Sequence, residues 1–201
     1  MGRFLLTVMV VTGLAGTINN TSLSKAERRS AISLMKDTRT ELLKNIKGLS
    51  DAQLNFKAGP DRWSIKECMY HIAISEQKLW ATMETNLKAP ANPEKRADIK
   101  VSDDDLIKKV EDRSTKVKTM EPFEPKNAPF KSMEEAVESY KNMRAEHIKY
   151  MKTTTEDLRN HVTAMPFGSI DSYQFCLFIA AHNNRHLQQI LEVKADPKYP
   201  K

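Results

Sequence analysis

Apolar residues recur every three or four positions along four long segments of the chain, which is the spacing of an amphipathic helix. The four segments are residues 25–47, 64–87, 132–151 and 171–193. Each holds about 20 residues, which as a helix span about 30 Å. No alternating strand pattern competes with this periodicity. The sequence therefore predicts an all-α fold, a four-helix bundle in which each helix turns its apolar face inward.

The starts of three segments carry a capping box, in which a serine caps the helix and a glutamate three residues later bonds back to it. The three boxes are Ser24 with Glu27, Ser64 with Glu67, and Ser132 with Glu135. The fourth segment has Ser169 or Asp171 as its expected cap. Gly48 is positioned to end the first helix, because glycine is the common residue just after a helix.

The connection between the second and third segments is long and covers residues 89–131, with many prolines and charges. Within it, residues 103–117 show a short helical pattern. A crossover of this length allows the helices that it joins to run parallel. We find no internal repeat in the 201 residues, so we expect one domain over residues 25–193 and a C-terminal tail over residues 194–201.

The first 15 residues have the three-part layout of a secretory signal peptide. Arg3 supplies a positive charge, residues 4–11 are mostly apolar, and Gly13 and Ala15 are the small residues that a cleavage site needs. The apolar stretch is shorter than the ~20 residues of a transmembrane helix. We therefore expect a cleaved signal, a linker over residues 16–24, and an exported protein, periplasmic or extracellular, with no stable membrane anchor. An uncleaved apolar arm or anchor is the alternative.

The formal net charge of +6 is dispersed along the chain rather than gathered in runs. Basic and acidic residues are interleaved, as in residues 108–116. This pattern is typical of a solvated helical face, and it argues against a nucleic-acid partner. The sequence does not decide between a monomer and a homodimer.

Two histidines lie four residues apart in the last segment, His182 and His186. In a helix this spacing places them one turn apart on one face, and counting ~100° per residue puts both near the centre of the apolar stripe. Two inward imidazoles are costly to desolvate unless their nitrogens find partners. One metal ion satisfies both, and helical metal sites use this spacing. Core histidines bonded to carboxylates or water are the alternative.

A third ligand has to come from another helix, and two histidines compete for this role. His71 lies beside the apolar stripe of residues 64–87, and His147 lies near that of residues 132–151. His161 falls outside the helices and is the weaker candidate. Periodicity alone does not separate His71 from His147.

Glu76 lies near the middle of an apolar stripe, between Ile72 and Leu79. A carboxylate at such a position is costly unless it is paired. It could orient a ligating imidazole, serve as a fourth ligand, or form an ion pair with Arg144. It is also the one inward carboxylate that we nominate as a catalytic residue, in the role of a general base.

Two motifs of this chain resemble those of the DinB-like superfamily, which includes YfiT-like proteins regarded as metal-dependent hydrolases. The first motif is Arg62-Trp63-Ser64-Ile65-Lys66-Glu67 followed by His71-Ile72. The second, residues 182–190, matches the signature HxxRHxxQI. The resemblance covers residues 25–193, with all four helices in order.

The resemblance implies a bundle with a long crossover between the second and third helices and a metal site of three histidines. Carried onto this chain, the ligands are His71, His182 and His186, which favours His71 over His147. The implied cofactor is one divalent ion, such as nickel or zinc. The implied activity is hydrolysis of a small molecule that the sequence does not name, or thiol-dependent S-transfer. Export argues for hydrolysis, since the transferases work in the cytosol; a non-catalytic metal-binding module is the third hypothesis.

The two cysteines, Cys68 and Cys176, lie on or beside apolar stripes. If His71 lies level with Asn184 and the two helices are antiparallel, as the resemblance implies, the cysteines are offset by ~16 Å along the bundle at ~1.5 Å per residue. A disulfide tolerates a Cα separation of only ~4.4–6.8 Å. We therefore expect two free, buried thiols.

Overall fold

The computed structural model of the protein describes residues 22–201. The predicted signal peptide, residues 1–15, and most of the predicted linker lie outside the described residues, so export stays a prediction. Within residues 22–201, no helix is both long enough and apolar enough to cross a membrane.

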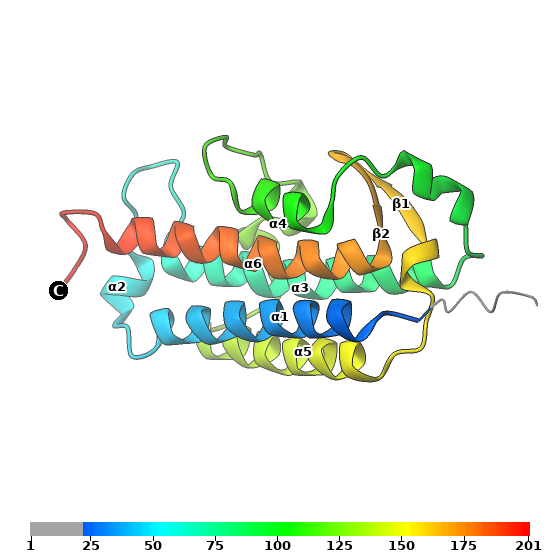
Figure 1. The fold of residues 1–201 in the computed structure, drawn as a ribbon. Helices are drawn as coiled ribbons and strands as arrows, with labels where there is room; N and C mark the ends of the chain where they lie inside the picture. Colours follow the sequence, from blue (N-terminus) through cyan, green and yellow to red (C-terminus); the bar gives the residue numbers. More distant parts are fainter. Residues whose placement is uncertain (1–21) are drawn as a thin grey trace, which may run out of the picture.

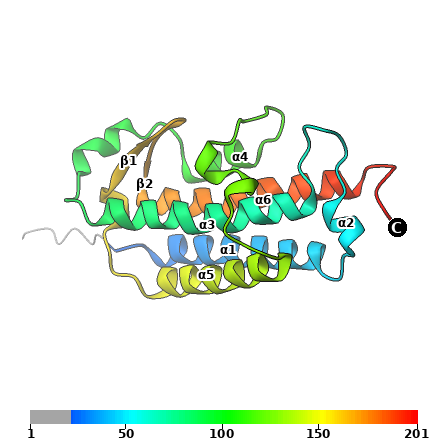
Figure 2. The same cartoon turned by 180° about the vertical axis from the view of Figure 1, so that it is seen from behind.

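Four long helices form a bundle, which confirms the predicted fold class. They are α1 (Lys25–Ile46), α3 (Ile65–Leu87), α5 (Met133–Thr153) and α6 (Ser172–Lys194). Helix α6 contacts α1 and α3, and α5 contacts the same two helices from the other side. Helices α1 and α6 run in one direction and α3 and α5 in the other, so the crossover does join two parallel helices (Figures 1 and 2).

The helix starts follow the capping chemistry of the sequence with one difference. Complete capping boxes begin α1 at Ser24 and α3 at Ser64, and Asp171 rather than Ser169 begins α6, in a box with Gln174. At α5, Ser132 accepts from the amide of Glu135, but the Glu135 carboxylate accepts from the amide of Lys131 at 2.8 Å. The predicted box at Ser132 is therefore only half formed.

Shorter elements lie between the long helices. They are α2 (Asp51–Asn55), η1 (Pro93–Asp98), α4 (Asp103–Glu111), η2 (Glu121–Phe123), η3 (Pro125–Asn127), η4 (Leu158–Asn160), β1 (Val162–Met165) and β2 (Gly168–Asp171). Helix α4 packs on α6. Strands β1 and β2 pair as an antiparallel hairpin, with Val162 opposite Asp171. Our expectation of no strands is wrong at this hairpin, because four-residue strands are too short to show a period of two.

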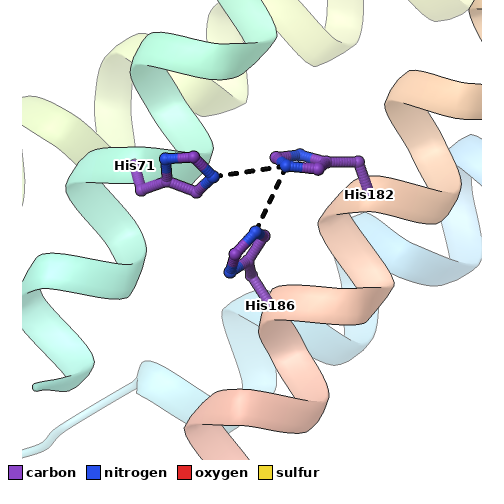
Figure 3. Close-up of side chains that lie close together, drawn as sticks. All are labelled: His71, His182 and His186. Atoms are coloured by element: carbon purple, nitrogen blue, oxygen red, sulfur yellow. Dashed lines mark hydrogen bonds between the residues drawn. The ribbon is translucent and has the colours of Figure 1, made fainter. Parts of the chain in front are cut away.

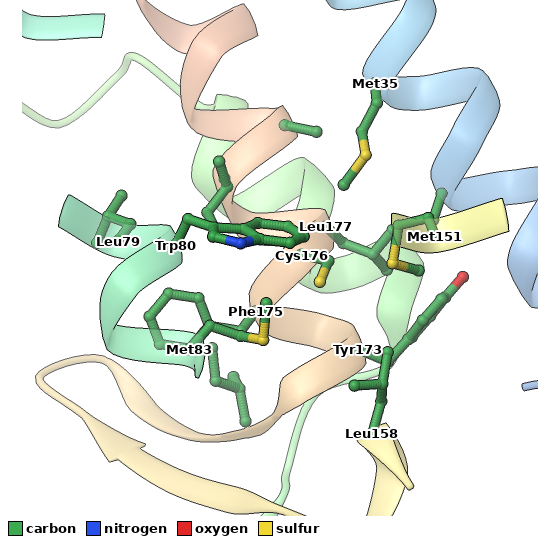
Figure 4. Close-up of a cluster of buried hydrophobic side chains, with 14 of the residues drawn as sticks. Met35, Leu79, Trp80, Met83, Met151, Leu158, Tyr173, Phe175, Cys176 and Leu177 are labelled. Atoms are coloured by element: carbon green, nitrogen blue, oxygen red, sulfur yellow. The ribbon is translucent and has the colours of Figure 1, made fainter. Parts of the chain in front are cut away.

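The core consists of two apolar clusters separated by a layer of buried polar side chains. The first cluster, near the hairpin, includes Met35, Trp80, Met151 and Phe175 (Figure 4). The second, near α2, includes Leu42, Ile65, Tyr140 and Ile190. Each long helix has at least one buried polar residue between its parts of the two clusters, among them Thr38, Glu76, Arg144 and Asn183.

The two cysteines belong to different apolar clusters, Cys68 to the second and Cys176 to the first. Both are free and fully buried, which confirms the prediction made from the helix register. Burial raises the pKa of both thiols far above the usual value, so neither is expected to react as a thiolate near neutral pH.

Candidate metal centre

Three histidines from two antiparallel helices converge on one point between α3 and α6 (Figure 3). The Nε2 atom of His182 lies 3.2 Å from Nε2 of His71 and 3.2 Å from Nε2 of His186. The ligand atoms of all three lie within 4.8 Å of one another. The structure thus brings together the three residues that the sequence nominated, and the spacing suits nitrogens that share an ion at ~2.1 Å.

The other ring nitrogens of two of these histidines are held by oxygen acceptors. Nδ1 of His71 lies 2.7 Å from the main-chain oxygen of Phe123, and Nδ1 of His186 lies 3.0 Å from Oε1 of Gln189. Because these oxygens only accept, each Nδ1 carries the proton and each Nε2 presents its lone pair. This is the tautomer in which Nε2 can bind a metal.

The convergent nitrogens are short of proton donors. His182 can donate from Nε2 to His71 or His186, but not to both. The only other donor recorded near them within residues 22–201 is Oγ of Ser75, 3.5 Å from Nε2 of His71, which is long for an O–H hydrogen bond. A divalent cation satisfies all three lone pairs at once, so the residues fit the ion that the sequence implied.

Burial keeps these imidazoles neutral. Burial lowers the pKa of His71 to about 4. For His182, burial and the neighbouring His71 and Arg185 hold the pKa well below its usual value, and for His186 burial and the other two histidines do the same. Neutral histidine is the form that binds metal, so no proton has to leave these rings near pH 7 for an ion to bind.

Trp63, just before the cap of α3, covers one side of the cluster. Its ring stacks on that of His186, with centroids 5.8 Å apart and an interplanar angle of 23°, and lies 4.9 Å from the ring of His71. Our sequence analysis placed Trp63 in a motif without giving it a role. The same holds for Gln189, although its position three residues after His186 on the same helical face was a usable signal.

The chain is similar to known proteins over most of its length. Residues 34–190, a span that includes all three histidines, match the sequence profile of the DinB superfamily. The chain belongs to the DinB superfamily. The resemblance seen in its two motifs is thereby confirmed.

Two relatives place this DinB-superfamily protein more closely. It is 28% identical over 165 residues to the uncharacterized protein YuaE of Bacillus subtilis (strain 168), a match that covers 81% of this chain and 96% of YuaE. Among solved structures it is similar to YfiT from Bacillus subtilis, with a TM-score of 0.58 and 13% identity over 86% of this chain and 89% of YfiT. YfiT is described as a probable metal-dependent hydrolase with an unusual four-helix bundle topology. At this identity the likeness shows a shared fold.

The two other candidate histidines of this DinB protein lie outside the cluster. His147 lies with Nδ1 2.7 Å from Oε1 of Glu76, and its ring stacks on Trp80 at 3.6 Å. The ring nitrogens of His161 lie near main-chain oxygens, Nδ1 2.8 Å from that of Asp157 and Nε2 3.1 Å from that of Ala89. Both rings therefore have protein partners of their own.

Glu76 forms the ion pair that was one of its three expected roles. Its Oε2 lies 2.6 Å from Nη2 of Arg144, and its Oε1 accepts from His147. Although burial raises the pKa of Glu76, Arg144 and His147 outweigh this and lower it, so the carboxylate is ionised near neutral pH. Among the described residues no hydrogen bond joins Glu76 to the three histidines, and its nomination as a catalytic base stays a prediction.

A pocket of about 470 Å³ reaches the cluster at His186, the histidine of the three that lines it. Its walls come from Trp63, from Gln189 on α6, and from crossover residues between Arg113 and Lys126. The same crossover supplies the Phe123 oxygen that holds His71. The crossover thus both orients a histidine and bounds the space in front of the cluster.

Proposed function

We propose that this protein is a metal-dependent hydrolase of a small molecule, with His71, His182 and His186 holding one divalent ion such as zinc or nickel. The observation that carries the proposal is the convergence of the Nε2 atoms of three neutral histidines next to a pocket. An ion on three histidines keeps positions open, where it supplies Lewis acidity and lowers the pKa of a bound water.

The chain's own residues prepare this site. Phe123 and Gln189 fix the rings of His71 and His186 so that Nε2 faces the common point, and Trp63 shields the cluster on one side. The pocket volume of about 470 Å³ suits a small molecule rather than a polymer segment. The description of YfiT as a probable metal-dependent hydrolase supports the same reaction class.

Metal analysis of the purified protein, followed by a panel of ester, amide and phosphoester substrates with and without chelator, tests the proposal. We expect about one divalent ion per chain, and hydrolysis that chelator abolishes and added metal restores. His71→Gln, His182→Gln and His186→Gln should each lose the ion. His161→Gln is the matched control, because this histidine bonds to main-chain oxygens away from the cluster.

Three other outcomes would contradict or change this proposal. A protein that binds no divalent ion when correctly folded overturns the proposal. Bound metal without turnover of any substrate would make the site a non-catalytic link between α3 and α6. Turnover only with an added low-molecular-weight thiol, giving a thiol adduct, would make the protein an S-transferase.

We also propose that the protein is exported, on the layout of residues 1–15 alone. Mass spectrometry of the mature chain from the source cell tests this, with an expected start near Gly16. A cytosolic protein that retains residues 1–15 would overturn it and would remove the argument against thiol transfer.

A further inference from the structure

The pocket beside the three histidines has an excess of basic side chains in its walls. The basic lining residues are Arg62, Arg113, Lys116, Lys118, Lys126 and Arg185. The acidic ones are Asp61, Glu67 and Glu124. The chain as a whole disperses its charge, so this concentration of one sign at one cleft is a local feature.

Two of the three lining carboxylates pair with lysines, and one of these lysines, Lys126, also lines the pocket. Glu67 caps the amide of Ser64 at 2.8 Å and accepts from Lys57 at 2.7 Å. Glu124 pairs with Lys126 at 2.6 Å. These carboxylates therefore offset lysines and a helix end, and they do not offset the arginines of the pocket.

The arginines of the pocket share few carboxylates. Arg113 binds Glu192 through two nitrogens, at 2.7 and 2.9 Å, and Arg62 binds the same carboxylate at 3.1 Å. One negative charge thus faces two positive ones. Glu192 does not itself line the pocket, and its single charge only partly neutralises the two guanidinium groups. Both arginines therefore make the electrostatic potential in the pocket more positive.

Arg185, next to the ligand His186, carries a charge with no carboxylate partner among the described residues. Its guanidinium donates to the main-chain oxygens of Val110, Asp112 and Thr115. This arginine anchors the crossover and adds positive potential to the pocket wall.

Lys116 and Lys118 lie on the exposed loop after α4. Within residues 22–201 neither lysine has a carboxylate within ion-pair distance. Their ammonium groups are therefore available to a ligand. They line the pocket from the crossover, and His186 lines it from α6.

We propose that this pocket recognises a small anion, so that the substrate of the hydrolase carries a carboxylate or phosphate group. Guanidinium and ammonium groups bind such oxygens through charge-assisted hydrogen bonds. Because the pocket reaches His186, an anion on the basic wall holds the rest of the molecule near this histidine. The reaction assigned to the substrate rests on the proposed function, but the recognition of the anion does not.

An NMR titration of the metal-free protein with succinate, inorganic phosphate and the neutral diamide of succinate tests the proposal. We expect succinate or phosphate to shift the signals of pocket residues, weakly and in a salt-dependent way, and the diamide to leave them unchanged. The anion with the higher affinity identifies whether carboxylate or phosphate is the preferred group.

Charge variants show whether the named side chains bind the anion. The double variant Lys116→Gln/Lys118→Gln should weaken anion binding by roughly three- to tenfold, as expected for two exposed ion pairs. Arg113→Gln should weaken it at least as much. The matched control is Lys36→Gln/Lys149→Gln, which removes the same charge from exposed lysines on α1 and α5 and should leave the affinity unchanged.

The same samples are then titrated with zinc, so that the two proposals fail separately. Equal anion affinity in the pocket and control variants, or binding of the diamide as tight as that of succinate, overturns the anion pocket even if zinc binds. Anion binding that depends on Lys116 and Lys118, in a protein that binds neither zinc nor any other divalent ion, keeps the pocket and overturns the hydrolase.

Discussion

Two buried polar clusters in this bundle both include a residue of α3, and they differ in the kinds of groups that they bring together. His71 and Glu76 are five residues apart on α3, yet Glu76 meets a cation and an imidazole, whereas His71 meets two more imidazoles. Both oxygens of Glu76 are bonded. The three Nε2 atoms of the histidines instead face one another.

The difference separates a structural cluster from a ligand site. Opposite charges with hydrogen bonds offset each other's desolvation, so the Glu76, Arg144 and His147 cluster is complete with protein groups, apart from Nε of Arg144. Like groups that converge do not offset each other, and the pocket opens beside them. A cation completes the histidine cluster, and nothing comparable is needed at Glu76.

Breaking the complete cluster should have the largest effect. Arg144→Met leaves the buried carboxylate of Glu76 with His147 alone, and we expect a loss of about 3–5 kcal/mol in the free energy of unfolding. Removing both charges in Glu76→Gln/Arg144→Met should recover part of this loss. Urea denaturation measures both.

Arg29→Met, on the exposed face of α1, is the control for this experiment and should change stability by no more than about 0.5 kcal/mol. If Arg144→Met is as stable as this control, the pair with Glu76 does not stabilise the fold and the contrast between the two clusters is lost.

At the histidine cluster, we expect the free energy of unfolding to depend on bound metal more than on the histidine side chains themselves. At zinc concentrations of about 100 times the dissociation constant, we expect about 2.7 kcal/mol of added stability. His186→Gln should abolish that increment while changing the metal-free protein little. His161→Gln should keep the increment, whatever it does to the metal-free protein. Thermal unfolding with and without zinc measures this, and an equal increment in His186→Gln would contradict the assigned site.

Periodicity and capping chemistry predicted the four long helices because each depends on contacts close in sequence. The predicted segments agree with α1, α3, α5 and α6 to within two residues at each end. The hairpin was missed because its pairing, Val162 with Asp171, is decided between strands that are each four residues long.

The sequence could predict the side chains that form the site, but it could not predict the main-chain group that orients one of them. The pair His182 and His186 follows from helical spacing, while the choice of His71 over His147 needed the family motif. His71 is oriented by the main-chain oxygen of Phe123, and because every residue has such an oxygen, the sequence does not reveal this contact. The partners of Glu76 depend on how α3 faces α5, and helical periodicity does not fix that rotation.

Acid should destabilise the two clusters in different pH ranges. Burial lowers the pKa of His71 to about 4, so the folded state takes up protons later than the unfolded state, whose histidines titrate near ~6.5. The stability lost should approach ~1.4 kcal/mol per pH unit for each such group as pH falls from ~6.5 toward 4. Glu76, whose pKa is lowered, contributes stability that is lost only below ~4.5.

Denaturation of the metal-free protein at a series of pH values separates these ranges. His71→Gln should flatten the dependence between pH 6.5 and 4, and Glu76→Gln should change only the part below it. A profile that His71→Gln leaves unchanged above pH 4 would mean that this ring is not held neutral by burial.

The smallest expected effect tests whether the hydrogen bond to Gln189 orients His186 for metal binding. Oε1 of Gln189 accepts from Nδ1 of His186 at 3.0 Å, whereas the neighbouring Gln188 donates to the main-chain oxygen of Glu111 at 3.2 Å. Partners of this kind usually contribute a factor of ~10–100 to metal affinity. We therefore expect Gln189→Ala to weaken zinc binding by about tenfold, close to 1.4 kcal/mol, with little change in metal-free stability. Gln188→Ala should leave the affinity unchanged, because it removes the same amide on the same helix without touching the cluster. Competition titration with a zinc chelator measures both variants, and equal affinities would assign the orientation of His186 to Trp63 and the helix alone.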